Sequence, residues 1–411
     1  MSTAKDHTIY RHKKNDSGIF KIIAIIVTLL IIAGGAIQFS IWLQGQLTRR
    51  VEASALEKFD QASALLAEGD HEGALNALSD VLERVENPDI SPTALLLEAD
   101  IHFAANRADR GVASLNAILE SYPQSAESHD AALRVARIHE ESGNIDEALK
   151  LYRQIKETAP ASIRAPATTA LGREQERAGD LVAARTLYNE ASQEAGWGSE
   201  AWMESVDRLG ALNTQIFFSN RHTEDSKVYT VAQGDSLTSI GSKLNVTQGQ
   251  LMRANGITNP DALRPNQALK FTPKDFRIVI ERSTTRIYLL DQKGVFKVYI
   301  AGLGKPGNDT TLGKYKIGNK EKNPTWHKPG SKPIPGGAPG NELGSRWLPL
   351  VPEEEGLPID LGIHGTIKPD SIGTYASMGC PRMHNAEVEE LYDLVVRSTP
   401  VEIVEVYTPQ S

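Results

Sequence analysis

The spacing of apolar and polar residues divides the chain into four stretches of different character. An almost wholly apolar run covers residues 19–43, and apolar positions then recur at helical spacing through residues 55–210. From residue 228 short strand-like runs alternate with turn signals, and from residue 276 β-branched and aromatic residues alternate with polar ones. The pattern predicts a multidomain chain with an N-terminal transmembrane helix, an all-α region, a small α+β module and a mostly-β domain.

The apolar run is long enough to cross a bilayer. It holds 25 residues, whereas ~20 helical residues suffice to span the hydrocarbon core. Lysines and arginines precede it and Trp42 lies at its far end, so the positive-inside rule keeps residues 1–18 as a cytoplasmic tail and exports the rest. The alternative is a cleaved signal peptide, whose apolar segment is shorter, at ~7–15 residues.

A sequence pattern recurs along the helical region, with a period about as long as one pair of helices. Turn residues recur at Gly69, Asn106, Gly143 and Gly179, in steps of 37, 37 and 36 residues. Five residues after each turn comes a small residue, and four further on a large one: Ala74 and Leu78, Gly111 and Leu115, Ala148 and Tyr152, Ala184 and Tyr188. This resembles tetratricopeptide repeats (TPR), whose unit is ~34 residues of helix–turn–helix. The resemblance implies a surface for a protein partner, and a plain helical spacer is the alternative.

Charge and cysteine content exclude several classes of protein. The net charge is −8, and residues 51–215 hold 14 basic and 29 acidic residues, which argues against a nucleic-acid binder. A single cysteine, Cys380, excludes an intramolecular disulfide framework, a zinc ribbon and a Cys-x-x-Cys redox site. Histidines and carboxylates show no metal-ligand spacing, so we predict neither a metal nor a cofactor.

A small module follows a polar stretch, residues 216–227, that is typical of a linker. Its strand Tyr229–Val231, its Gly-Asp-Ser-Leu turn and its closing Asn266-Gln267 strand resemble a LysM domain over residues 228–273. The resemblance implies binding to glycan strands that contain N-acetylglucosamine. The residues expected to line the glycan groove, each of which could instead be a turn or core residue, are Gly234, Asp235, Ser236, Leu237, Asn259, Pro260 and Leu263.

Two motifs in the last domain carry chemistry. His364 lies in Ile-His-Gly-Thr, and Cys380 lies 16 residues later in Ser-Met-Gly-Cys-Pro-Arg-Met. A thiolate is a strong nucleophile, and a nearby imidazole can take its proton and later protonate a leaving amine. Glycine beside each residue lets the backbone approach a substrate and aim amide N–H groups at an oxyanion. The pattern therefore favours a cysteine enzyme over an inert core thiol.

Residues 276–406 resemble the L,D-transpeptidases with a YkuD-type domain. The match rests on His-Gly-Thr followed by Gly-Cys-x-Arg, and it departs from the family at Met378, where histidine is common. The resemblance implies that Cys380 is the nucleophile and His364 the proton donor and acceptor. It further implies that the Gly365 carbonyl orients His364 and that the Gly379 N–H binds the oxyanion. The residues expected to bind substrate are Arg382, Ser377 and Thr366.

This resemblance implies a bacterial peptidoglycan enzyme. Cys380 would form a thioester with one stem tetrapeptide and pass it to a second, which makes a 3→3 cross-link. We then expect a single-pass protein of the bacterial cell membrane, with its catalytic part in the periplasm or cell wall. Two alternatives share the sequence: an L,D-carboxypeptidase, in which water resolves the thioester, and a non-catalytic peptidoglycan-binding scaffold.

Overall fold

A computed structural model describes residues 38, 42, 53–84, 90–327, 330 and 332–409. The predicted anchor at 19–43 lies outside the described residues except for Gln38 and Trp42, which are helical and exposed. No helix within the described part of the chain is both long and apolar enough to span a bilayer. The chain divides into two compact units, residues 1–141 and 142–411, which are described separately.

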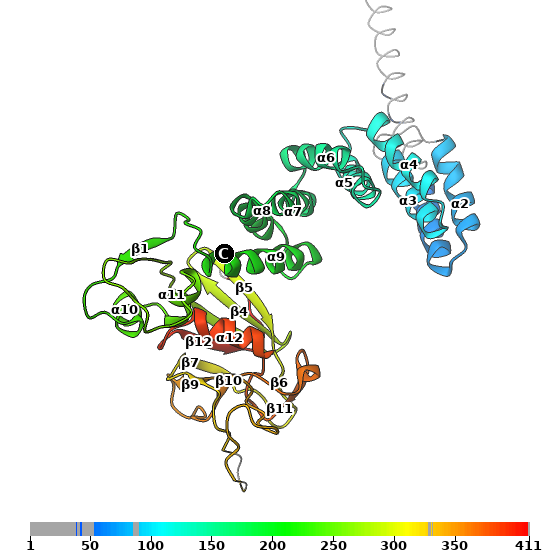
Figure 1. The fold of residues 1–411 in the computed structure, drawn as a ribbon. Helices are drawn as coiled ribbons and strands as arrows, with labels where there is room; N and C mark the ends of the chain where they lie inside the picture. The colour runs from blue at the N-terminus through cyan, green and yellow to red at the C-terminus, as the bar shows by residue number, and fades with distance from the viewer. Residues whose placement is uncertain are drawn as a thin grey trace, which may run out of the picture. The chain divides into compact units, whose positions relative to one another are not determined.

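The first unit is helical (Figure 1). A helix over 53–68 precedes four further helices: α2 (His71–Arg84), α3 (Ser91–Ala104), α4 (Ala108–Ser121) and α5 (Ala126–Glu141). Ala62, Leu78 and Ile101 are fully buried between the first of these helices, and Leu115 and Ile118 are buried in α4. Apolar residues at helical spacing therefore make a core here, as the pattern predicts.

In both units the residues of the repeated pattern lie at the turns and in the core of the helix pairs. Gly69, Asn106, Gly143 and Gly179 have φ angles of +84°, +58°, +82° and +82°, the left-handed conformation that ends a helix and favours Gly or Asn. The small and large residues that follow each turn are all buried: Ala74, Leu78, Gly111, Leu115, Ala148, Tyr152, Ala184 and Tyr188. The predicted TPR-like region is thus confirmed as helical, with its repeat positions in the core.

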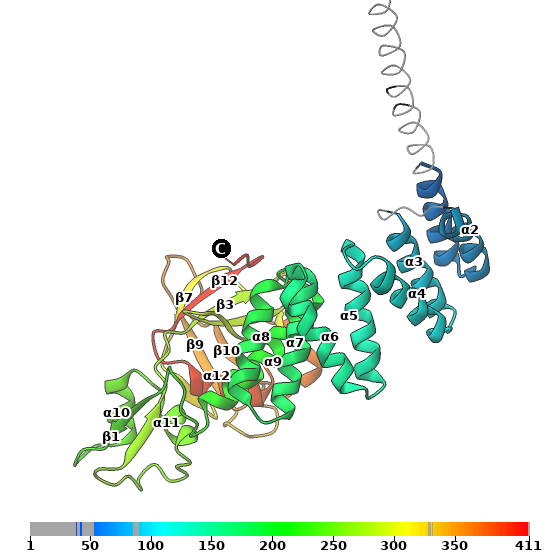
Figure 2. The ribbon, with the colours of Figure 1, turned by 90° about the horizontal axis from the view of Figure 1, so that it is seen from above.

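The second unit begins with four helices (Figure 2). These are α6 (Ile145–Thr158), α7 (Ala161–Arg177), α8 (Leu181–Glu194) and α9 (Glu200–Phe217). Ion pairs link neighbouring helices, including Arg164 to Glu194 at 2.8 Å. Helix α9 runs past residue 210, where the helical region was expected to end.

A small module lies between α9 and the C-terminal domain. Strands β1 (Lys227–Thr230) and β2 (Ala268–Phe271) pair antiparallel, and α10 (Leu237–Leu244) and α11 (Gln248–Ala254) pack on them. Ser236 caps α10 in a capping box with Ser239. Leu237, Ile240, Leu251 and Leu269 make its core.

The C-terminal domain is built on a mixed sheet. Within the described residues the strand order is β10-β9-β7-β12-β3-β4-β5, and β8 also pairs with β9. Strand β12 runs parallel to β3, and the other pairs in this sheet are antiparallel. The strands are β3 (Arg277–Glu281), β4 (Arg286–Asp291), β5 (Gly294–Ile300), β7 (Gly313–Ile317), β8 (Glu321–Lys322), β9 (Arg346–Pro352), β10 (Gly362–His364) and β12 (Pro400–Val404). A separate parallel pair joins β6 (Leu303–Gly304) to β11 (Tyr375–Ser377).

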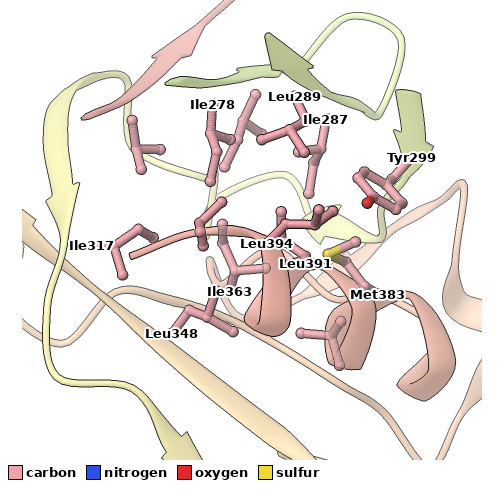
Figure 3. Packing of buried hydrophobic residues seen from close by; sticks show 14 of the residues in the cluster. Ile278, Ile287, Leu289, Tyr299, Ile317, Leu348, Ile363, Met383, Leu391 and Leu394 are labelled. Atoms are coloured by element: carbon pink, nitrogen blue, oxygen red, sulfur yellow. The ribbon is translucent and has the colours of Figure 1, made fainter. Parts of the chain in front are cut away.

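One face of this sheet is covered by helix α12 (Asn385–Leu394). Figure 3 shows Leu391 and Leu394 of this helix among side chains from several strands, with Ile278, Ile287 and Leu289 on the sheet side. Ile363, the first residue of one motif, and Met383, the last residue of the other, lie in the same cluster and are fully buried. The core therefore fixes the backbone segments that contain His364 and Cys380.

The opposite face of β3 and β4 is covered by α9. Val279, Tyr288 and Leu290 point to this side and pack against Trp202 and Val206 of the helix. Because side chains alternate across a strand, β3 and β4 are buried on both faces, and their inner residues, 278–280 and 287–290, are aliphatic except for Tyr288.

The polar stretch 216–227 was expected to be a linker, and this prediction is wrong at its start. Phe217 and Phe218 are buried in the core of the C-terminal domain, where Phe217 meets Phe276 and Phe296 at ring-centroid distances of 6.0 Å. The segment lacks a period because its apolar residues, Ile216, Phe217 and Phe218, are consecutive, and the partners of the two phenylalanines lie far along the chain.

Candidate active site

The backbone joins the two motifs that the sequence singles out. Strand β10 pairs with β9 through His364 opposite Trp347. On its other side the His364 N–H donates to the Pro381 carbonyl at 3.1 Å, and its carbonyl accepts from the Met383 N–H at 2.8 Å. The segment that follows Cys380 is thus hydrogen-bonded to His364 as a short strand, which places the two residues in one site.

The His364 imidazole has a defined tautomer. Its Nδ1 lies 2.6 Å from the Gly365 carbonyl oxygen, and because a carbonyl can only accept, Nδ1 carries the hydrogen. In the neutral ring Nε2 is then the nitrogen with a free lone pair. The ring is 4% exposed and lies beside Trp347 at a centroid distance of 5.8 Å. A ring in this tautomer can take a proton through Nε2.

Cys380 is partly buried against the same core. Its thiol Sγ lies 3.8 Å from the Asp360 carbonyl oxygen, a weak hydrogen bond. Burial raises the pKa of the Cys380 thiol, and a hydrogen bond to the Gly362 backbone opposes this shift. The thiol is therefore protonated at neutral pH in the structure.

Burial also lowers the pKa of His364, to about 4, against the opposing effect of its hydrogen bond to Gly365. Near pH 7 the pair consists of a neutral thiol and a neutral imidazole. Nucleophilic chemistry at this site requires a proton transfer from Sγ to the ring.

The loop before Cys380 is tied down by hydroxyl groups. Gly379 has a φ of +121°, which L-residues other than glycine rarely adopt. Its carbonyl accepts from Thr310 Oγ1 at 2.7 Å, and its N–H donates to Ser377 Oγ at 3.1 Å. An oxyanion at the Gly379 N–H would therefore compete with the Ser377 hydroxyl. Ser377 itself is 1% exposed, so it shapes the loop from beneath, whereas the sequence predicted substrate contact.

Met378 occupies the position where the related family commonly has histidine. Its side chain is 68% exposed. It lies on the outside of the loop and does not pack against the buried His364.

Asn385, the first residue of α12, was not singled out by the sequence. Its Oδ1 accepts from the N–H groups of Ser345 and Thr366 at 3.1 and 3.2 Å, and its Nδ2 donates to the Thr366 carbonyl at 2.9 Å. A Cβ on Gly365 would come within 2.1 Å of Asn385 Oδ1, so glycine beside His364 is required by this contact. Thr366 is buried and serves the same clamp.

Arg382 lies behind His364, where its backbone forms an isolated bridge with the histidine. Its Nη2 is 3.5 Å from Glu342 Oε2, and Glu342 Oε1 also pairs with Lys368 at 2.8 Å. The Nε of Arg382 is buried and has no hydrogen-bond partner among the described residues. The guanidinium thus combines a structural ion pair with one unsatisfied donor. Glu342, like Asn385, was missed by the sequence analysis.

The predicted groove residues of the small module fall into two groups. The first group forms the turn before α10 and the start of that helix. Asp235 Oδ2 accepts from Tyr229 and from the Ala232 N–H, both at 2.8 Å, while Ser236 caps α10. Leu237 is 1% exposed in the core. Gly234 forms the turn before them, with a φ of +85°.

The second group lies at a shallow groove. The groove has a volume of about 630 Å³ and runs along the loop 255–267, where Asn259 is one of its lining residues. Pro260 and Leu263 lie in the same loop and are partly buried, but they are not among the residues that line this groove.

The depressed pKa of His364 predicts how stability depends on pH. The unfolded residue titrates near 6.5 and the folded one near 4, so below pH 6.5 the unfolded chain binds the extra proton. His364 therefore contributes stability above pH 6.5 that is lost as the pH falls towards 4, by up to about 3 kcal/mol. We expect urea unfolding between pH 7 and 4 to show a smaller loss for His364→Asn than for the native protein. Equal losses in the two proteins would contradict this expectation.

Comparison with known proteins agrees with this geometry. Three family profiles match: a tetratricopeptide repeat-like domain at residues 21–207, a LysM domain at 229–272 and an L,D-transpeptidase catalytic domain at 275–403. The first of these begins within the segment predicted to span the membrane.

Curated relatives carry the same assignment. The candidate L,D-transpeptidase YqjB of Bacillus subtilis is 34% identical over 133 residues, which cover 32% of this chain and 73% of YqjB. The candidate L,D-transpeptidase YkuD of the same organism is 32% identical over 182 residues, which cover 43% of this chain and 97% of YkuD. With matches of this identity over most of each relative, the chain belongs to the L,D-transpeptidase family.

Proposed function

We propose that this protein is a peptidoglycan L,D-transpeptidase that forms 3→3 cross-links through a thioester on Cys380. The observation that carries the proposal is the His364 ring, whose Nδ1 is held by the Gly365 carbonyl on a strand bonded to the segment after Cys380. Family membership supplies the reaction class, and the site supplies the residues.

In the first half-reaction His364 Nε2 takes the proton of the Cys380 thiol. The thiolate attacks the carbonyl carbon of the third residue of a stem tetrapeptide. The bond to the terminal D-Ala breaks, the proton on Nε2 passes to the leaving amine, and a thioester remains.

In the second half-reaction the side-chain amine of a second stem, from its own third residue, attacks the thioester. Nε2 accepts the proton of this amine and returns it to sulfur as the bond to Sγ breaks. The product is an amide between the third residues of two stems. The N–H of Gly379 is proposed to bind the oxyanion of both steps, once the Ser377 hydroxyl has turned away.

Arg382 is proposed to bind a substrate carboxylate. A guanidinium pairs well with a carboxylate, and the position of Arg382 two residues after Cys380 supports this role. Ser377 and Thr366 are buried, so we assign them to the support of Gly379 and Gly365.

The LysM domain is proposed to hold glycan strands of the wall. The groove at loop 255–267, with Asn259 in its lining, supports this assignment. We further propose that residues 19–43 anchor the protein in the cell membrane, and that the TPR-like helices receive a protein partner.

Product analysis tests the function. The purified protein is mixed with a disaccharide-tetrapeptide, and both intact protein and products are followed by mass spectrometry. We expect a thioester adduct on Cys380, released D-Ala and a 3→3 dimer. Release of D-Ala with only tripeptide would replace the proposal with an L,D-carboxypeptidase. A reactive thiol with no adduct and no product would indicate a scaffold.

A further inference from the structure

The LysM domain is held at a joint with both α9 and α12. Lys270, on strand β2 of the LysM domain, is 4% exposed. Its ammonium donates to the carbonyls of Ile216, Phe217 and Ser219 at 3.2, 3.2 and 2.8 Å. These carbonyls belong to the C-terminal end of α9, where the helix dipole favours a positive charge.

Lys270 has no carboxylate partner among the described residues, and burial lowers the pKa of its ammonium. A buried charge is costly unless it is hydrogen-bonded. The three carbonyls of the α9 terminus supply those bonds, so Lys270 holds strand β2 of the LysM domain on the end of α9.

A second set of contacts reaches α12. Arg253 of the LysM domain lies 3.5 Å from Asp393 Oδ2, and the guanidinium stands over the Phe218 ring at 3.5 Å from its centroid. Thr247 Oγ1 donates to the Asp393 carbonyl. A Cβ on Gly249 would come within 2.0 Å of Asp393 Oδ1, so the Asp393 side chain lies directly against the Gly249 backbone.

Both anchoring helices belong to the structure that carries the site. Helix α9 covers the sheet and is bonded to it by Asn213 Nδ2, which donates to the Phe296 carbonyl at 2.8 Å. Helix α12 ends beside Asp393 and begins at Asn385, which clamps the residues around Gly365. Its 10 residues make a rigid link of about 15 Å between the joint and the site.

We propose that Lys270, Arg253 and Asp393 are positioning residues that fix the LysM domain relative to Cys380, so that the enzyme acts on stem peptides at a set place along the glycan strand it holds. This inference rests on the proposed function. In polymeric glycan each stem peptide is attached to its strand. The joint therefore selects polymeric glycan as the substrate class. A fragment too short to reach both the groove and Cys380 gains nothing from the joint.

Pulse EPR tests the joint without any enzymatic activity. In full-length Cys380→Ala protein, spin labels are placed through Asp261→Cys in the LysM domain and Lys314→Cys on β7, both exposed positions. We expect a narrow distance distribution, and a broad one after Lys270→Met or Asp393→Ala. Lys227→Met, which removes an exposed lysine of the same domain, is the matched control and should leave the distribution narrow. A narrow distribution in both joint variants would overturn the proposal.

Activity then tests the consequence. In protein with native Cys380, the joint variants should lose about tenfold in kcat/KM on polymeric peptidoglycan, a modest part of what proximity can supply, and stay within about twofold on a disaccharide-tetrapeptide. Asp393→Ala repeats the test at a second contact in case Lys270→Met disturbs the LysM domain. Equal losses on both substrates would overturn the proposal. If the native protein turned over neither substrate, the proposed function would be wrong. The EPR result would still show whether Lys270 and Asp393 fix the position of the LysM domain.

Discussion

Cys380→Ala is expected to abolish turnover of a disaccharide-tetrapeptide, with a loss of three orders of magnitude or more, roughly what removal of a covalent nucleophile costs. The variant keeps the backbone that pairs with His364, so the fold should survive. Intact-protein mass spectrometry should show no adduct, and D-Ala release should fall to background.

Met378→Ala is the matched control for this variant. It changes a residue two positions earlier in the same loop, with a side chain 68% exposed and turned away from the core. We expect it to retain turnover within a few-fold. Persistent D-Ala release by Cys380→Ala would mean that another group is the nucleophile.

His364→Asn is expected to reduce acylation by two to four orders of magnitude, which is about the range for loss of a general acid–base. Asparagine can still donate to the Gly365 carbonyl in place of Nδ1, but it offers no counterpart to Nε2. Single-turnover thioester formation measures the effect. Alkylation of the Cys380 thiol at high pH should continue in this variant, because hydroxide then removes the proton.

His384→Asn is the control for the histidine. His384 is exposed and directly precedes α12, so its loss should leave acylation unchanged. A His364→Asn protein that acylates at the native rate would remove His364 from the mechanism.

The sequence was most informative where local pattern and tertiary structure agree. The turn residues and the small and large positions of the helical repeats could be predicted because each unit repeats the same packing with its neighbour. His364 and Cys380 could be predicted because each stands beside a glycine in a short motif. Their relative placement follows from the backbone hydrogen bonds of His364 to Pro381 and Met383.

The supporting residues could not be predicted because their partners lie far along the chain. Asn385 bonds to residues 19 and 40 positions away, and no local pattern marks such an asparagine. Ser377 illustrates a different limit: its place in the motif suggests substrate contact, but only the structure shows that its hydroxyl turns inwards to Gly379. Phe217 and Phe218 were missed because the apolar residues of this polar stretch, 216–218, are consecutive and therefore carry no period.

The packing of α9 on β3 and β4 has a consequence for how this protein can be divided. Trp197, Trp202 and Val206 precede the LysM domain, yet they cover Tyr288 and Leu290, which follow it. In sequence, the LysM domain therefore lies between α9 and the sheet that α9 covers. An expression fragment started at residue 276 would expose the apolar face of β3 and β4 to solvent, and recombination at that boundary would separate the sheet from its cover.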